Sequence, residues 1–353
     1  MKQAVLHVRA VFAHRLAARA GLLLSLTALS ACDLAPDYSP PHYVVPVSWH
    51  GQGLFRDAAP GAVALKPDWW TLFDDATLNG LEQQALANNA DLQAAAERFA
   101  QSRAIVMEAR SELLPHFGMA FGASDNKSST DRLFRFKGPI TATDEFYSGL
   151  ASWEPDIWSG IRNRVRVQKY YAQEQAADYA AARLSLQAEL ATDYFALRGL
   201  DAQHAIYTQS IAYYQQALHV TQTRLDNQDA TGIDVARAQN QLYMTQAHLL
   251  DVQAQREVLE HGIAVLVNEQ PSTFHIASVD TLTNVEPIVP TGLPSDLLER
   301  RPDIAAAERR MAQANRAIGI ARAAFYPHVF FSANGGFDSN GFNLANLANS
   351  MWS

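Results

Sequence analysis

The sequence predicts an α+β protein. Long antiparallel helices are expected to form a coiled-coil shaft, β-strands accompany it, and the arrangement is internally duplicated. Three observations predict this class: a long stretch between Pro155 and Pro271 that contains no other proline, two runs with strand periodicity, and a repeat at long spacing. Hydrophobic residues make up 48% and charged residues 18% of the 353 residues, so the chain has enough apolar surface to fold.

Residues 1–31 have the pattern of a bacterial secretory signal. They contain four basic residues and no acid, followed by a short apolar run that is too short to cross a bilayer. Leu29-Ser30-Ala31-Cys32 resembles the bacterial lipobox, and Cys32 is the only cysteine of the chain. We therefore expect cleavage before Cys32 and a covalent diacylglycerol and N-acyl (palmitate) chain on this residue. The alternative is an ordinary signal peptide with a chance cysteine.

Charge excludes several classes of partner. The net charge is −8, and loss of the four basic residues of the signal would lower it to −12. Such an acidic chain argues against a nucleic-acid partner and against a polybasic lipid-binding patch. After residue 32 the sequence contains no apolar stretch of the length that a transmembrane helix needs, so membrane entry would require β-strands.

The first part of the mature chain predicts an extended arm followed by a helix and a hairpin. Residues 32–76 are rich in proline and aromatic residues, and Thr77 is the expected N-cap of a helix over residues 78–114, which Pro115 ends. Phe117, Met119 and Phe121 then alternate along a strand, and residues 146–153 form a second alternating run. A β-hairpin is expected at about 116–153.

Two long helices are expected at about 161–226 and 233–267, where alanine, glutamine, leucine and arginine dominate. The first would be roughly 100 Å long. Small residues on two faces would let each helix contact neighbours on both sides, as the wall of a tube requires. A surface helix with high intrinsic propensity is the alternative. Residues 271–293 are predicted to be a linker.

A shift of 212 positions places residues 298–328 on residues 86–116 without a gap. The pairs identical in both copies are Leu86/Leu298, Asp91/Asp303, Ala94/Ala306, Ala95/Ala307, Arg98/Arg310, Ala100/Ala312, Gln101/Gln313, Ala109/Ala321, Arg110/Arg322, Pro115/Pro327 and His116/His328. The repeat predicts a first unit at 77–270 and a second at 294–353. The second lacks counterparts of the later elements, with one strand at 329–337 and a loop after it, so we expect a C-terminally truncated chain.

Six stretches resemble the outer-membrane factors of tripartite (RND-type) efflux systems, specifically the NodT/OprM-type lipoproteins related to TolC. They lie at residues 29–32, 35–41, 69–81, 152–160, 232–239 and 292–308. The last reads GLPSDLLERRPDIAAAE and is the most specific of them.

The resemblance implies a homotrimer in which each protomer gives four strands to one twelve-stranded β-barrel and long helices to a periplasmic tunnel. It implies passive export of drugs or other small solutes, with a periplasmic adaptor and an inner-membrane pump as partners. It also implies an outer-membrane location with the helical part in the periplasm. Asp33, directly after Cys32, resembles an inner-membrane retention signal, which leaves retention there as an alternative.

The sequence contains no catalytic motif, so we predict that the protein is not an enzyme and that it needs no cofactor or metal. Trp153 and Trp158 are the predicted membrane-interface aromatics. His116 and His328 are expected at helix-to-strand corners, in a capping or hydrogen-bonding role rather than as metal ligands. The alternative functions are a periplasmic coiled-coil scaffold or adaptor lipoprotein without a pore, and a non-functional fragment of the channel.

Overall fold

The computed structural model describes residues 33–42, 44, 67–129, 131, 141–280, 294–339 and 351–352. The predicted signal and Cys32 therefore lie outside the described residues. The chain divides into two compact units. Unit 1 comprises residues 1–41, 100–174 and 307–353, and unit 2 comprises residues 42–99 and 175–306. Each unit contains residues of both sequence repeats, so the borders of the two compact units differ from the predicted borders of the repeats. The repeat borders stay a prediction.

The two long helices have the bounds that their composition suggests. Helix α4 spans Gly160–Asp226 and α5 spans Gly232–Leu266. Because no proline interrupts either stretch, the backbone hydrogen-bond ladder continues until the turn between them, where Gln228 takes a positive φ of 66°. Thr231 and Asp234 then form a capping box that begins α5.

The expectation of one helix over residues 78–114 is wrong. The structure contains a short 3-10 helix, η2 (Trp69–Phe73), followed by α2 (Ala76–Asn88) and α3 (Ala90–Ser111). Asn89 separates the last two because its backbone is extended, with ψ 122°. Its side-chain oxygen accepts from Leu92 N at 2.9 Å and its amide donates to Leu266 O at 3.0 Å, so the side chain replaces helical hydrogen bonds.

The expected N-cap was also wrong by two residues. Asp75, not Thr77, begins α2, since its Oδ1 accepts from the backbone amides of Thr77 (2.8 Å) and Leu78 (3.0 Å). A carboxylate is favoured over a hydroxyl at this position because it also interacts with the positive end of the helix dipole.

In the second repeat, α6 (Pro294–Arg300) precedes α7 (Pro302–Ala323). Proline at the first position of a helix interrupts the preceding hydrogen-bond ladder and has the φ that the new helix needs. The break at residue 301 is thus shifted by 212 positions from the break at Asn89, although a different residue type produces it.

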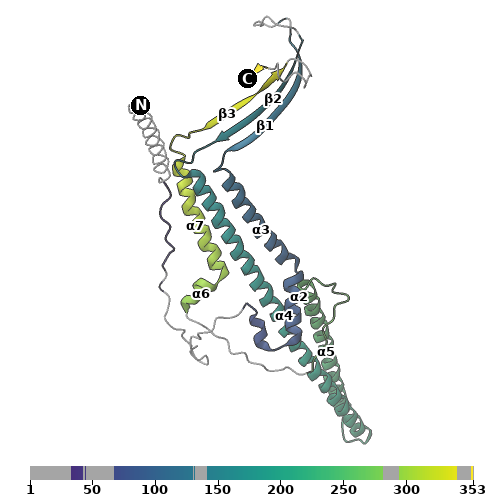
Figure 1. Cartoon of the computed structure of the whole chain (residues 1–353). Helices are drawn as coiled ribbons and strands as arrows, with labels where there is room; N and C mark the ends of the chain where they lie inside the picture. The colour runs from purple at the N-terminus through teal and green to yellow at the C-terminus, as the bar shows by residue number, and fades with distance from the viewer. Residues whose placement is uncertain are drawn as a thin grey trace, which may run out of the picture. The chain divides into compact units, whose positions relative to one another are not determined.

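Among the described residues, four antiparallel strands form one sheet in the order β1-β2-β3-β4, and Figure 1 labels the first three of them. They are β1 (His116–Lys127), β2 (Thr141–Trp153), β3 (Phe331–Ser339) and β4 (Met351–Trp352). The loop expected at the end of the chain is therefore wrong at residues 351–352, where Trp352 pairs with Phe337. Gly336 is required in β3, because a Cβ there would lie 2.2 Å from Tyr147 O.

Unit 2 contains the larger apolar core. Leu78, Leu190, Leu197 and Ile263 are completely buried and bring α2, α4 and α5 together. Residues 271–280, expected to belong to a linker, also pack on this core through Ile276, which is only 4% exposed. Charged groups fix the same segment: Arg256 donates to Ile276 O at 2.6 Å and Arg198 donates to Ala277 O at 2.6 Å.

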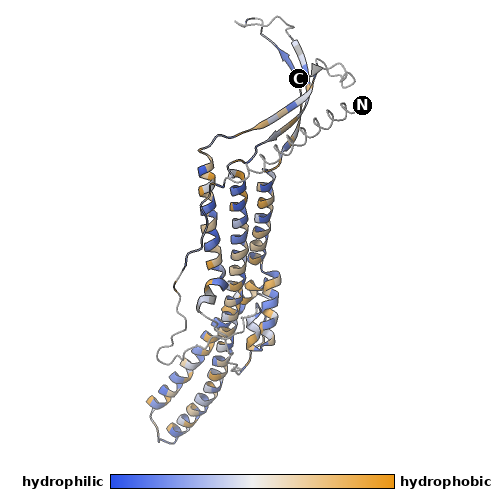
Figure 2. Cartoon of the chain, turned by 60° about the vertical axis from the view of Figure 1, so that its left-hand side comes forward, coloured by the Kyte–Doolittle hydropathy of each residue, from blue (hydrophilic) through white to orange (hydrophobic). Residues whose placement is uncertain are grey.

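Hydrophilic and hydrophobic residues are intermixed along the helices (Figure 2). Among the described residues, none of the helices combines the length and the apolar character needed to cross a membrane.

Candidate functional site

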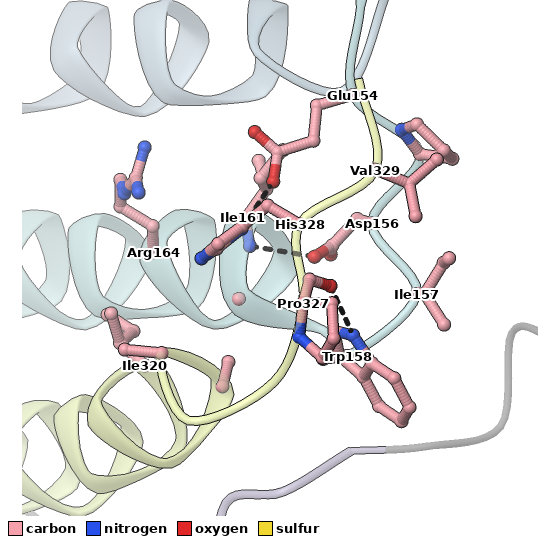
Figure 3. A pocket seen from close by; sticks show the side chains of 14 residues that line it. Glu154, Asp156, Ile157, Trp158, Ile161, Arg164, Ile320, Pro327, His328 and Val329 are labelled. Atoms are coloured by element: carbon pink, nitrogen blue, oxygen red, sulfur yellow. Dashed lines mark hydrogen bonds and ion pairs between the residues drawn. The ribbon is translucent and has the colours of Figure 1, made fainter. Parts of the chain in front are cut away.

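The helix-to-strand junction of unit 1 surrounds a cavity of about 260 Å³ (Figure 3). The loop from β2 to α4 lines one side of it, and the connection from α7 to β3 lines the other. We call this region the junction and define it by the lining residues Glu154–Trp158, Gly160, Ile161, Arg164, Ile320, Ala323, Ala324 and Pro327–Val329.

Asp156 holds the start of α4 at the junction. Its Oδ1 accepts from Ile161 N at 2.9 Å, and its Oδ2 accepts from Arg162 N at 2.8 Å and from Arg162 Nε at 3.1 Å. The carboxylate satisfies amides that a helix start leaves without partners and interacts with the helix dipole. The turn that leads into the helix has a positive φ of 57° at Ser159.

Of the two predicted interface tryptophans, Trp158 lines the junction and Trp153 directly precedes it, and each connects the two repeats. Trp153 Nε1 donates to Leu113 O at 3.2 Å, and its ring stacks on Phe331 with a centroid distance of 6.1 Å. Trp158 Nε1 donates to Pro327 O at 3.1 Å, and its ring stacks on Tyr326 at 4.5 Å. The two side chains thus have a structural role at the ends of helices and strands.

The two corner histidines differ. His328 Nδ1 lies 2.9 Å from Glu154 Oε1 across the junction, as the expected hydrogen-bonding role requires. His116 is the first residue of β1 and pairs with Ser152. Within the part of the chain that the structure describes, no group of three or more histidine, cysteine, aspartate or glutamate side chains is arranged to hold a metal ion.

The N-terminal arm carries a second cluster, which the sequence analysis missed. The Asp33 carboxylate accepts from Asn163 Nδ2 at 2.8 Å and from Ala35 N at 3.1 Å, and it forms ion pairs with Arg166 and with Arg316 (3.3 Å). Burial opposes ionisation of this group, but the hydrogen bonds from Asn163, the Ala35 amide and Arg166 outweigh it and lower its pKa. The side-chain partners Asn163, Arg166 and Arg316 lie 130 to 283 residues away in sequence.

A second attachment point lies five residues further along the arm. Tyr38 Oη donates to Glu308 Oε1 at 2.7 Å. Burial and this hydrogen bond raise the pKa of Tyr38 to about 12. Departures from the internal repeat were the signal in the sequence, since Glu308, Arg316 and Gly319 stand where the first copy has Ala96, Ala104 and Met107.

Comparison with known proteins identifies the relatives of this chain. It is similar to the pyoverdine export outer membrane protein OpmQ of Pseudomonas aeruginosa, with 30% identity over 320 residues that cover 89% of this chain and 66% of OpmQ. It is similar to the cation efflux system protein CusC of Escherichia coli, with 29% identity, covering 92% of this chain and 69% of CusC. The chain thus spans 66% of the length of the first relatives that it matches.

Solved structures agree in fold. The outer-membrane channel OprN superimposes with a TM-score of 0.79 and 27% identity, over 91% of this chain and 72% of OprN. The CmeC outer membrane channel of Campylobacter jejuni superimposes with a TM-score of 0.76 at 23% identity, over 91% of this chain and 69% of CmeC, a likeness that concerns the fold alone. The family described as outer membrane efflux protein matches residues 81–269 and 293–351. The chain therefore belongs to the outer membrane efflux protein family.

Proposed function

We propose that this chain forms part of the outer-membrane duct of a tripartite efflux pump, through which drugs or other small solutes leave the periplasm passively. Family membership supports this function, and one observation in the sheet carries it furthest. Ser152 of β2 pairs with His116 of β1 on one side and with Ser332 of β3 on the other. The repeat offset of 212 places Ser332 of β3 on Ala120 of β1. Ser152 therefore pairs with residue 116 of β1 and with the equivalent of residue 120 in β3, so the two equivalent strands are staggered by four residues.

A stagger between strands is what a closed barrel of tilted strands requires. Strand β1 pairs with β2 only, and so leaves an edge of backbone groups among the described strands. In lipid, each unsatisfied group costs several kcal/mol. Closure with copies of the same sheet would satisfy them, which supports a shared barrel. The family resemblance makes this barrel a twelve-stranded one, formed by a homotrimer with four strands from each protomer.

The exposed side chains of β1 fit a lipid-facing surface. Phe117, Met119 and Phe121 occupy alternate positions and are 82%, 92% and 82% exposed. Alternation places them on one face of the strand. We propose that this face contacts lipid and that Trp153 and Trp158 lie at the membrane interface beside the periplasm.

A lipid anchor on Cys32 and a location in the outer membrane complete the proposal. An acyl chain attaches a protein to a membrane without crossing it, and lasting attachment needs a second signal. The proposed barrel would supply that signal. No cofactor or catalytic step is part of this function.

The turn between α4 and α5 is the proposed docking site for a periplasmic adaptor, which connects the duct to an inner-membrane pump. Arg224 and Arg237 lie beside a cavity of about 420 Å³ there, together with Asp229 and Asp234. Hydrogen bonds from Thr231 lower the pKa of Asp234, so its carboxylate is charged at neutral pH. Charges of both signs at a helix turn suit a polar, reversible interface.

The test is to purify the full chain in detergent and measure its native mass and its conductance in planar bilayers. We expect a trimer that carries a lipid mass on Cys32 and forms discrete ion-conducting steps. A Cys32→Ala chain that is monomeric and soluble without detergent would contradict the duct and support the scaffold alternative.

A substitution on the strand face sharpens the test. Met119→Arg should reduce membrane insertion strongly, by about 2–4 kcal/mol if the position faces the bilayer midplane. Ser124→Arg, on the opposite face of β1, is the matched control and should insert nearly as well as the parent chain. Equal effects of the two changes would contradict a lipid-facing stripe.

A further inference from the structure

The arm residues Asp33–Tyr38 lie antiparallel to α7. Leu34 O accepts from Arg322 Nη1 at 3.1 Å near the end of the helix, whereas Tyr38 contacts Glu308 near its start. These two contacts thus follow α7 in reverse order over 14 residues, or about 21 Å of helix, while Arg316, which lies between them on α7, reaches Asp33. Two separate attachment points fix the direction of the arm.

The Asp33 carboxylate occupies a receptor made by two helices. Asn163 and Arg166 are three residues apart on α4 and share one face, while Arg316 reaches the carboxylate from α7. Asn163 is completely buried, and the Arg316 side chain is 18% exposed. Charge-assisted hydrogen bonds of this kind are stronger than neutral ones.

Gly319 makes the close approach of the arm feasible. A Cβ at this position would lie 2.7 Å from Ala35 Cβ and 2.7 Å from Asn163 Nδ2. Real Cβ atoms do not show such contacts, so any larger residue would displace the arm or the asparagine. The glycine is therefore a feature of the receptor rather than of the helix, whose formation it disfavours.

The first copy of the repeat lacks this receptor. Residues Glu308, Arg316 and Gly319 of α7 correspond to Ala96, Ala104 and Met107 of α3. Met107 is 63% exposed. Both copies have an arginine three residues further on, Arg110 in α3 and Arg322 in α7, but the partners of the two differ. Arg110 Nη1 lies 4.0 Å from Met107 Sδ, whereas Arg322 donates to Leu34 O of the arm.

We propose that these residues form a clasp which selects α7 over its copy α3 as the docking site of the arm, and that Asp33 is its positioning residue. The clasp also pairs the Asp33 carboxylate, whose side chain is 33% exposed, with two arginines, and so competes with the inner-membrane retention that an aspartate after the lipidated cysteine signals. This second part rests on the proposed lipid anchor, because Cys32 is joined directly to Asp33. The retention that the sequence leaves as an alternative then applies mainly to a chain whose arm is released.

Hydrogen exchange of residues 33–38 in the purified full chain tests the clasp. Asp33→Asn and Arg316→Ala should each raise exchange roughly tenfold, the effect of losing a charged hydrogen bond. The exchange rate of the double variant should be only slightly higher than that of either single variant, because both substitutions remove the same contact. Asp33→Glu should keep most of the protection, and Gly319→Met should release the arm as well.

The repeat supplies matched controls. Met107→Gly and Arg110→Ala change the equivalent positions of α3 and should leave exchange of the arm unchanged. Unchanged exchange in both Asp33→Asn and Gly319→Met would overturn the clasp. Release of the arm by Arg110→Ala as readily as by Arg322→Ala would overturn the selection of α7.

Membrane fractionation in a host that retains lipoproteins with aspartate after the lipidated cysteine tests this competition. Gly319→Met should move part of the chain to the inner membrane, and adding Asp33→Ser should return it to the outer membrane. Outer-membrane location of Gly319→Met alone would overturn the competition. A chain without lipid mass would refute the proposed anchor and the competition together, whereas hydrogen exchange would still decide the clasp.

Discussion

Helices α3 and α7 are copies of one sequence, yet they have different neighbours. Each contains 22 residues, and their bounds, Ala90–Ser111 and Pro302–Ala323, differ by the repeat offset at both ends. Both follow a short helix and end before Pro-His. The Pro-His that follows both helices was kept, whereas the residue types at their starts and on the arm-binding face of α7 differ. Duplication therefore supplied a second helix whose surface residues could change while its length and its place between a short helix and a strand stayed the same.

The largest difference in stability between the two copies is expected at one repeat position that is buried in α3 but only partly buried in α7. Leu92 is 5% exposed and belongs to the core of unit 2, whereas its counterpart Ile304 is only partly buried. Leu92→Ala should lower the free energy of unfolding by about 3 kcal/mol, through lost transfer energy and the remaining cavity. Ile304→Ala should cost less than half of that. Thermal unfolding of both variants in detergent measures the contrast, and equal costs would contradict it.

A buried acid distinguishes the short helices that precede α3 and α7. Glu82 of α2 is completely buried, and neither of its carboxylate oxygens has a hydrogen-bond partner among the residues that the structure describes. The corresponding residue of α6 is Pro294. Burial raises the pKa of Glu82 to about 8. Because this folded-state pKa exceeds the ordinary value of 4.5, stability is full below pH 4.5 and falls as the pH rises towards 8.

The expected loss over this range is on the order of 2 kcal/mol, after allowance for relaxation around the buried charge. Glu82→Gln should remove this dependence on pH. Unfolding midpoints of the parent and variant chains between pH 4 and pH 9 measure it. Parallel pH profiles for the two chains would show that Glu82 does not titrate in this way.

The two helix breaks provide the smallest contrast. Asn89→Ala removes the cap on Leu92 and the hydrogen bond to Leu266 O, and should cost about 1–2 kcal/mol. At the equivalent break, Arg301 forms an exposed ion pair with Asp303, which contributes little. Arg301→Ala should therefore change the melting temperature hardly at all. A larger effect of Arg301→Ala than of Asn89→Ala would contradict the conclusion that the side chain stabilises the first break much more than the second.

Local signals in the sequence predicted much of this fold, because they act over a few residues. The absence of proline predicted α4 and α5, and alternation at Phe117, Met119 and Phe121 predicted β1. The break at Asn89 was missed because asparagine is tolerated within helices, and its role here depends on Leu266, which lies 177 residues away. The length of β2 was also underestimated, since its first residues pair with β1 without a strong apolar pattern.

The candidate sites also differ in whether local sequence signals or contacts between distant residues determine them. Trp153, Trp158 and the corner role of His328 were suggested by motifs and by the repeat, although only the structure supplies their partners, Glu154 for His328 among them. The arm contacts require knowledge of which helix lies beside Asp33, and sequence spacing alone contains no such information. Comparison of the two copies contains part of it, because a receptor that is present in one copy appears as unexpected differences.

The matched lengths of α3 and α7 also have a consequence for insertions and deletions. Removing one residue from a helix shortens it by about 1.5 Å and turns everything beyond it by about 100°. A single deletion in α3 or α7 would therefore rotate one strand attachment relative to the other and disturb the register of the sheet. Deletions of one residue at equivalent positions in both helices would keep the two strand attachments matched. Natural length changes in these helices should consequently occur in pairs.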